Sequence, residues 1–307
     1  MDGISYISLN LDAAPLPQED IHYMRLFTRL LGKMDTEQHT WEELDPLVTR
    51  YLYDNTFGVF VSGRNGDYHP YLVAEWYSLD EDLEKGYSLT EEILYHTQFT
   101  DTQTLLERIQ EQKNFVRGQI SQSVYSVLLY RQLAISGSFA RYYGYLNFLD
   151  YYSFLSDLEQ LMQEHPEEVV SRLEHVQQFF ANRSGAIAAA AGSEASLELN
   201  RPLADAFMAG LDDVSREPAV YDLPFPAKKE GLIVDTNIQF NMVASYWKEI
   251  DPEADGTAYA ALGQLVTDQL LFPVLRDQMG AYGAYCESDS RCKPRRSRHH
   301  NMGISHD

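Results

Sequence analysis

The residues of this chain that could do chemistry are histidines that stand close to glutamates, which is the pattern of a zinc peptidase. Such enzymes carry two histidines one helical turn apart with a glutamate beside them, as HExxH or as the inverted HxxEH. Two segments approach the inverted form: His39-Thr40-Trp41-Glu42 is followed by Glu43, and His165-Pro166-Glu167-Glu168 is followed by Val169. Each lacks one ligand, so we interpret both as helix starts and expect no metal site in this chain.

The sequence also lacks the signatures of other enzyme classes. It contains no GxSxG nucleophile elbow, no GxxxxGK[ST] phosphate loop and no GxGxxG dinucleotide motif. One segment combines a cation and a phenol at the end of an apolar helix: it begins at Leu270 and contains Arg276, a glycine turn at Gly280, and Tyr282. On residue pattern alone, the preferred interpretation is a helix C-terminus with a favourable cation and a structural tyrosine.

Length and charge narrow the class of protein. The 307 residues suffice for two ordinary domains, and 44% of the residues are apolar. There is no run of about 18 apolar residues and no basic stretch before an apolar one at the N-terminus, so we expect neither a membrane span nor a signal peptide. The net charge of −22 opposes nucleic-acid binding. It favours solubility or, alternatively, attraction of basic substrates.

The cysteine content points to a reducing compartment. The two cysteines, Cys286 and Cys292, are separated by residues 287–291 and form no CxxC pair. This spacing is typical neither of a disulfide framework nor of a zinc site. We therefore expect the protein in the cytoplasm or in an organelle matrix.

The first part of the chain predicts strands and helices in mixed order. Alternating hydrophobic residues indicate a strand over residues 4–11, and an apolar stripe closed by Gly32 indicates a helix over 21–31. Thr40 and Glu43 have the spacing of a capping box that opens a second helix. The remaining elements are a hairpin of strands 56–62 and 68–77 around Asn65-Gly66, and helices over 80–97 and 102–117, the last capped by Asp101.

The second part begins with an almost continuous helical pattern over residues 120–181. We expect its tyrosines to pack between helices; they are Tyr142, Tyr143, Tyr145, Tyr151 and Tyr152. The pattern then predicts a strand over 184–191, a helix over 194–210, a linker over 218–229, a strand over 232–247, a polar loop over 251–256, a helix over 257–275 and a strand that begins at Tyr282.

This order of elements predicts an α+β fold with two similar units, each with helices on one face of an antiparallel-rich sheet. We expect the first unit over residues 1–120, a helical bridge over 121–164, and a second, truncated unit over 165–287. Residues 288–307 form a basic tail without apolar periodicity. It is interpreted either as a segment that binds nucleic acid or a partner, or as a non-native end, which we favour.

The segment around Arg276 resembles a known family. Residues 270–285 are similar to the ReKGGAYG stretch in the last domain of pitrilysin/insulinase-type zinc metallopeptidases, and most similar to the presequence-protease branch. Residues 36–44 resemble the T…sYeeL motif of that branch, and residues 134–141 resemble a small and aromatic stretch in its associated region. The resemblance covers about residues 1–285 and implies the C-terminal, zinc-free half of such an inverzincin peptidase.

The family resemblance implies a division of labour between two halves that close around an unfolded peptide. The N-terminal half would carry HxxEH and the zinc, so this chain would hold no cofactor and be inactive alone. Arg276 would bind the substrate near the scissile bond. Tyr282 would also contact the substrate and would be catalytic, because its hydroxyl would donate to the oxyanion. The partners would be an unfolded peptide and the zinc-bearing half, with no nucleic acid and no membrane.

The sequence departs from the family pattern in two places. Met279 replaces the first glycine of the turn, and the final elements of the last domain are expected to be missing. Two other functions stay open: a stand-alone, non-catalytic partner subunit that binds peptide or completes a zinc-bearing subunit in trans, and a structural scaffold. Arg276 and Tyr282 favour the peptidase half or the partner subunit over the scaffold.

Overall fold

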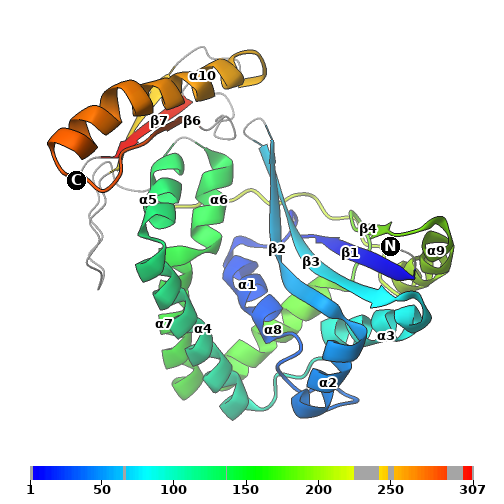
Figure 1. The fold of residues 1–307 in the computed structure, drawn as a ribbon. Coiled ribbons are helices and arrows are strands. Elements are labelled where there is room, and N and C mark those ends of the chain that lie inside the picture. The colour runs from blue at the N-terminus through cyan, green and yellow to red at the C-terminus, as the bar shows by residue number, and fades with distance from the viewer. Residues whose placement is uncertain are drawn as a thin grey trace. The chain divides into compact units, whose positions relative to one another are not determined.

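The computed structural model describes residues 3–64, 67–135, 137–224, 242–247, 252–288 and 300–305 and shows an α+β fold, as predicted (Figure 1). The chain divides into two compact units. The first consists of residues 1–60, 69–113 and 154–221, and the second of residues 61–68, 114–153 and 222–307. The predicted domain boundaries near residues 120, 164 and 287 stay predictions.

The first unit is built on a four-stranded sheet of order β2-β3-β1-β4. Its strands are β1 (Ile4–Asp12), β2 (Tyr53–Arg64), β3 (Asp67–Leu79) and β4 (Ile187–Ala191). The inner strand β1 runs antiparallel to β3 and β4, and Tyr6 lies opposite Tyr77 in β3 and Ala191 in β4. Along β1, Ile7 and Leu9 are buried whereas Tyr6 is exposed, which is the alternation expected of a half-buried strand.

Helices pack against one another and bury one face of this sheet. They are α1 (Ile21–Leu30), α2 (Trp41–Tyr51), α3 (Leu83–Tyr95), α8 (Pro166–Phe180) and α9 (Glu194–Ala209), with the short 3-10 helices η1 (Gln18–Asp20) and η2 (Asp80–Asp82). Two further helices, α4 (Thr102–Gln122) and α7 (Phe148–Glu164), have residues in both units. Helix α1 packs on α8, and α3 packs on α9, which also contacts β1 and β4. Figure 1 shows α1 next to α8. The described residues contain no helix with the length and apolar composition needed to cross a bilayer.

The predicted helix starts are confirmed by their caps. The Thr40 side chain accepts a hydrogen bond from the Glu43 backbone, and the Glu43 carboxylate accepts one from the Thr40 N–H at 2.9 Å, which completes the capping box of α2. Asp101 Oδ1 accepts from the Thr104 N–H at 3.1 Å ahead of α4. Pro166 occupies the first turn of α8, where its missing N–H costs nothing.

Close approach of α3 to β3 depends on Gly86. A Cβ at this position would lie 2.8 Å from Ser78 Oγ and 3.0 Å from Trp76 Nε1. The Ser78 hydroxyl cannot move away easily, because it donates a hydrogen bond to the Tyr51 carbonyl at 2.5 Å. By contrast, a Cβ at Gly118 within α4 would meet no atom within 4 Å.

We expect Gly86→Ala to lower the free energy of unfolding by about 1–2 kcal/mol, because overpacking forces neighbouring groups apart. The matched variant Gly118→Ala should raise it by up to about 1 kcal/mol, because alanine restricts the unfolded chain and has the higher helix propensity. Thermal unfolding followed by circular dichroism measures both. Equal stability of the two variants would contradict the close packing of α3 on β3.

The second unit contains α5 (Val124–Leu133), α6 (Ser138–Leu146), α10 (Pro252–Val266) and the π-helix η3 (Thr267–Gln278). Its strands β5 (Met242–Trp247), β6 (Cys286–Ser288) and β7 (His300–Ser305) form a sheet of order β5-β7-β6. Tyr142 and Tyr151 are buried, and the Tyr130 and Tyr143 rings stack with centroids 4.3 Å apart. The prediction of packing between helices is thereby confirmed for Tyr143, whereas the Tyr142 ring lies 4.9 Å from that of Tyr68 in strand β3.

The second unit corrects three local predictions. The helix expected from residue 257 begins at Pro252, because a proline is suited to the first turn and two acidic residues follow it there. Tyr282 does not begin a strand, since Gly280 (φ +78°) ends the helix and β6 starts only at Cys286. Within the tail, residues 300–305 pair with β5 and β6. Parts of four predicted elements lie outside the described residues. They are the hairpin turn at 65–66, the linker from 225 and the strand up to 241, and the tail over 289–299.

Candidate functional site

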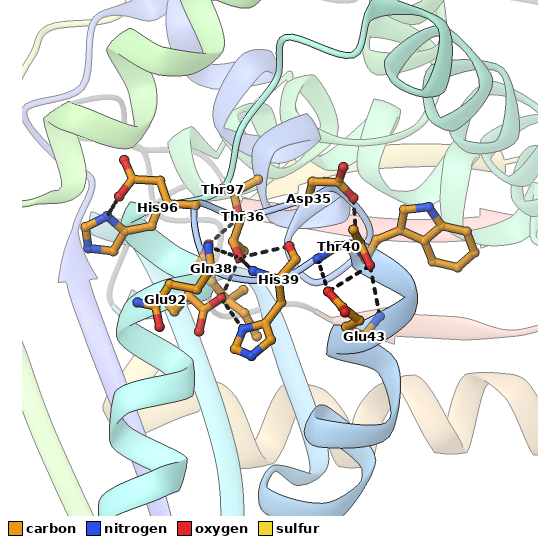
Figure 2. A network of polar contacts seen from close by, with 12 residues as sticks. Asp35, Thr36, Gln38, His39, Thr40, Glu43, Glu92, His96 and Thr97 are labelled. Carbon is orange, nitrogen blue, oxygen red and sulfur yellow. Dashed lines mark hydrogen bonds and ion pairs between the residues drawn. The ribbon is translucent and has the colours of Figure 1, made fainter.

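The histidine of the first incomplete zinc motif, His39, lies in a polar network of the first unit (Figure 2). His39 Nδ1 is 2.8 Å from Glu92 Oε1, and Thr36 Oγ1 donates to the same oxygen at 2.5 Å. Glu92 projects from α3 and is buried. The Thr36 hydroxyl in turn accepts a hydrogen bond from the His39 N–H at 2.9 Å. These contacts therefore supply hydrogen-bond partners to the Glu92 carboxylate, which is buried and has little contact with water.

The same network fastens the loop before α2 to the end of α3. The Gln98 N–H donates to the Asp35 carbonyl at 2.8 Å, and the Trp41 N–H donates to Asp35 Oδ1 at 2.8 Å. His96 Nδ1 lies 3.2 Å from a carboxylate oxygen of Glu37 (Figure 2). All of these contacts lie within the loop of residues 35–41 or connect it to residues 92–98 at the end of α3. The network therefore has a structural role: it holds the loop against α3.

The donor set of these residues does not fit zinc. A zinc site needs three or four protein ligands around one point. Here the His39 ring pairs with Glu92, whereas Glu43 is engaged in the capping box. The second motif is similar: His165 Nδ1 lies 3.3 Å from Glu167 Oε1 at the exposed start of α8. In the part of the chain that the structure describes, no group of three or more His, Cys, Asp or Glu side chains could hold a metal.

The Arg276–Tyr282 segment forms a tight turn at the C-terminal end of η3. The Met279 N–H donates to the Val274 carbonyl at 3.2 Å, and the Gly280 N–H donates to the Arg276 carbonyl at 3.1 Å. The positive φ of +78° falls on Gly280, where it costs little, whereas Met279 has a φ of −103°. The methionine that departs from the family pattern therefore adds no backbone strain.

A small apolar core holds both sides of this turn. Its members are Leu271, Leu275, Ala281, Ala284 and Cys286, all buried. The Cys286 N–H also donates to Thr267 Oγ1 at 2.9 Å, which ties the start of β6 to the start of η3. The side chains that point away from this core are consequently presented on a backbone that is fixed on both sides.

Arg276 and Tyr282 are exposed on this turn, as are Asp277, Gln278 and Met279 between them. The Tyr282 side chain is 97% exposed, so its hydroxyl is open to a ligand. Arg276 is exposed as well, and its guanidinium carbon lies 5.1 Å from the centroid of the Phe272 ring, an arrangement that orients the cation. The Tyr285 ring packs edge-on against the same phenylalanine at 6.2 Å. The turn thus presents a phenol and a cation that can contact an anion or a carbonyl oxygen.

A hollow that no sequence pattern predicted lies on the sheet of the first unit. Residues of β1, β2, β3 and β4 line it, with Tyr6 and Tyr77 among them. The only signal in the sequence was a tyrosine at an outward position of a strand, and aromatic residues are common in strands without any functional role. The register that places Tyr6 beside Tyr77 is a long-range property that no local pattern contains.

Comparison with known proteins gives one family match. The family model for the associated domain of M16 peptidases, subfamily C, matches residues 2–158. Protein HypA of Clostridium perfringens is 23% identical over 285 residues, which cover 92% of this chain and 29% of that protein. Presequence protease 1, chloroplastic/mitochondrial, of Arabidopsis thaliana is 24% identical over 298 residues, which cover 94% of this chain and 27% of that protein. The chain thus spans less than a third of the length of these relatives.

Solved structures share the fold along nearly the whole chain. A conserved protein from Enterococcus faecalis V583 has a TM-score of 0.63 at 14% identity, with 99% of this chain and 71% of that chain covered. The peptidase M16 inactive domain from Pseudomonas fluorescens has a TM-score of 0.53 at 13% identity, with 99% and 69% covered. At this level of identity the likeness concerns the fold alone, and it agrees with the α+β architecture described above.

Proposed function

Because the chain belongs to the family of domains associated with M16 peptidases of subfamily C, we propose that it is the substrate-enclosing, non-zinc half of a metallopeptidase that degrades short unfolded peptides. The observation that carries this proposal is the anchored turn after η3, which presents Arg276 and Tyr282 to solvent. A tyrosine with a purely structural role would be expected to pack within the chain. The 97% exposure of Tyr282 instead leaves its hydroxyl open to a ligand.

Arg276 is proposed to bind the peptide near the bond that is cleaved. Its guanidinium offers five N–H donors in a planar fork. The Phe272 ring beneath it holds the fork in place without using its donors. Carbonyl oxygens of an extended peptide, or a terminal carboxylate, are the groups that such a fork recognises.

Tyr282 is proposed to stabilise negative charge that develops on the peptide carbonyl during cleavage. The phenolic O–H donates to the carbonyl oxygen, and this hydrogen bond strengthens as the oxygen becomes an oxyanion. Because Ala281 and Ala284 are buried on either side of Tyr282, the backbone of the donor is fixed before the substrate arrives. Zinc chemistry would be supplied by the half of the peptidase that bears HxxEH.

Reconstitution tests this function directly. The purified chain is mixed with a matching HxxEH-bearing half, and cleavage of a quenched basic peptide is followed with and without a chelator. We expect cleavage only when both chains are present and the chelator is absent. Metal analysis of the isolated chain should find no stoichiometric zinc. Cleavage that does not need this chain, or one tightly bound zinc per isolated chain, would contradict the proposal.

A fused version of the two halves separates the two arrangements left open by the sequence. Equal activity of the mixed and the fused proteins would support a subunit that completes the peptidase in trans. Activity of the fused protein alone would support a half that acts within one long chain. The relatives are more than three times as long as the matched region, which is consistent with the second arrangement.

A further inference from the structure

The sheet of the first unit carries a hollow of 480 Å³ on the face that its helices do not cover. Strand alternation defines this face: Ile7 and Leu9 of β1 are buried, and Tyr6 and Ser8 between and beside them point the other way. One side of the hollow is lined by the small side chains of β4. Ala189 and Ala191 lie opposite Ser8 and Tyr6 there. The remaining sides are formed by larger residues of β1, β2 and β3.

Three tyrosines form an aromatic wall along one end of this face. The centroids of the Tyr6 and Tyr77 rings are 5.3 Å apart, and those of Tyr53 and Tyr77 are 6.1 Å apart with an interplanar angle of 15°. Tyr6 is 40% exposed and Tyr53 is 39% exposed, although each belongs to a strand of the sheet. The rings therefore present aromatic surface to solvent, and such surface binds alkyl chains and cations.

The charge of the hollow is of one sign. Glu75 and Asp54 line it, and none of its lining residues is a lysine, an arginine or a histidine. Glu75 accepts one hydrogen bond, from Ser8 Oγ at 3.0 Å, which orients the carboxylate. Asp54 has a φ of 46°, a left-handed conformation that is uncommon for a residue other than glycine and often marks a functional position.

We propose that this hollow binds a lysine or arginine side chain of an extended, unfolded peptide. The aliphatic stem and the cation lie against the rings of Tyr6 and Tyr77, and the charge is neutralised by Glu75 and Asp54. The inference rests on the proposed function only for the choice of a peptide as ligand, because the site itself contains neither Arg276 nor Tyr282. It adds a second contact for the substrate on this half of the peptidase.

Charge argues for this occupant over a second copy of the chain. With a net charge of −22, two copies repel each other, and an acidic hollow would meet an acidic partner. A small inorganic cation would use the two carboxylates but not the three tyrosine rings. A basic side chain on an extended backbone matches both the charge of the hollow and its aromatic wall.

Binding to the isolated chain tests the proposal without any need for catalysis. The probe is a fluorescein-labelled peptide of about ten residues, long enough to cross the sheet when extended, with arginines and leucines in alternation. A second probe carries citrulline, the neutral counterpart of arginine. Fluorescence anisotropy should show saturable, salt-sensitive binding of the arginine peptide. The citrulline peptide should bind about tenfold more weakly.

Variants of the lining residues locate the site. The double variant Asp54→Asn/Glu75→Gln removes both charges with little change of shape, and asparagine tolerates the left-handed conformation of residue 54. This variant, and separately Tyr77→Ala, should each weaken binding about tenfold. Glu174→Gln on α8 and Phe115→Ala on α4 change exposed residues elsewhere and should bind like the unchanged chain. If Tyr77→Ala fails to fold, the double variant still decides the result.

Two results would overturn the site. One is the absence of saturable binding to the folded chain, and the other is unchanged affinity of the double variant. Loss of binding in Arg276→Ala but not in the double variant would also overturn it, and would leave the proposed function intact. Conversely, binding at the hollow together with failure of the reconstituted peptidase would contradict the proposed function alone.

Discussion

Replacement of Tyr282 by phenylalanine is expected to lower kcat of the reconstituted peptidase by about 100-fold and to leave KM nearly unchanged. Only the hydroxyl is removed, and 97% exposure of the side chain means that no packing within the chain is lost. A donor that acts on the developing oxyanion stabilises the transition state more than the bound substrate. Its loss therefore lowers kcat and kcat/KM together.

Tyr285 supplies the matched control for this measurement. It is the next tyrosine in the turn, is 49% exposed and packs edge-on against Phe272. Tyr285→Phe keeps this ring contact and should retain full activity. Arg276→Lys keeps the charge but loses the planar fork, so it should raise KM more than it lowers kcat. An unchanged kcat for Tyr282→Phe would remove Tyr282 from catalysis.

Elements with strong local signals were predicted from the sequence. Strand β1 followed from its alternating residues, and α1 from its apolar stripe with Gly32 behind it, which has a φ of +72°. The start of α2 followed from the capping box of Thr40 and Glu43. In each case the residues that determine the element lie within a few positions of one another. A local sequence pattern is therefore enough to predict it.

Features that depend on distant partners were not predicted. Strand β7 exists because its backbone pairs with β5, from Trp247 opposite His300 to Met242 opposite Ser305, and no local pattern contains that pairing. The π-helical turns of η3 were also missed, since Thr267–Gln278 has the composition of an ordinary helix interrupted by Pro273. The hollow at Tyr6 and Tyr77 was missed for the same reason, because it depends on the pairing of strands that are far apart in the sequence.

For the candidate site, the residue pattern and the family resemblance led to different predictions. By pattern alone, Arg276 and Tyr282 were interpreted as structural, because a cation at a helix C-terminus needs no further role. The resemblance to a peptidase family gave them functional roles. The structure adds an independent reason to test those roles, since both side chains are exposed on a backbone that the buried residues Leu275, Ala281 and Ala284 anchor.

The ion pair between the buried Asp20 and the partly exposed Arg172 is expected to give the largest change in stability. Asp20 is 1% exposed at the start of α1, and its Oδ1 lies 3.0 Å from an Nη of Arg172 in α8. In the described part of the chain, neither carboxylate oxygen accepts a hydrogen bond, so the contact is ionic rather than directional. Burial raises the pKa of Asp20, and the charges of Arg172 and His175 partly oppose this rise.

Arg172→Met should lower the free energy of unfolding by about 2 kcal/mol, because it leaves a buried carboxylate without its cation. The loss is smaller than for a fully buried pair, since the Arg172 side chain is 38% exposed and water already screens it. The thermal midpoint should fall by about 5 °C. Methionine keeps an unbranched apolar stem but removes the guanidinium, whose carbon also lies 5.6 Å from the centroid of the Tyr23 ring, so the charge on Asp20 has to be tested separately.

A double-mutant cycle with Asp20→Asn decides whether this interpretation is correct. In the Asp20→Asn background no buried charge needs a partner, so Arg172→Met should cost less than half of its effect in the unchanged chain. The pH dependence gives a second readout. Because the pKa of Asp20 is raised above 3.8 in the folded state, its carboxyl favours folding at low pH. That contribution is lost as the pH rises through the folded-state pKa, and Asp20→Asn should abolish it. Equal costs of Arg172→Met in both backgrounds would show that the arginine stabilises α8 through packing and not through Asp20.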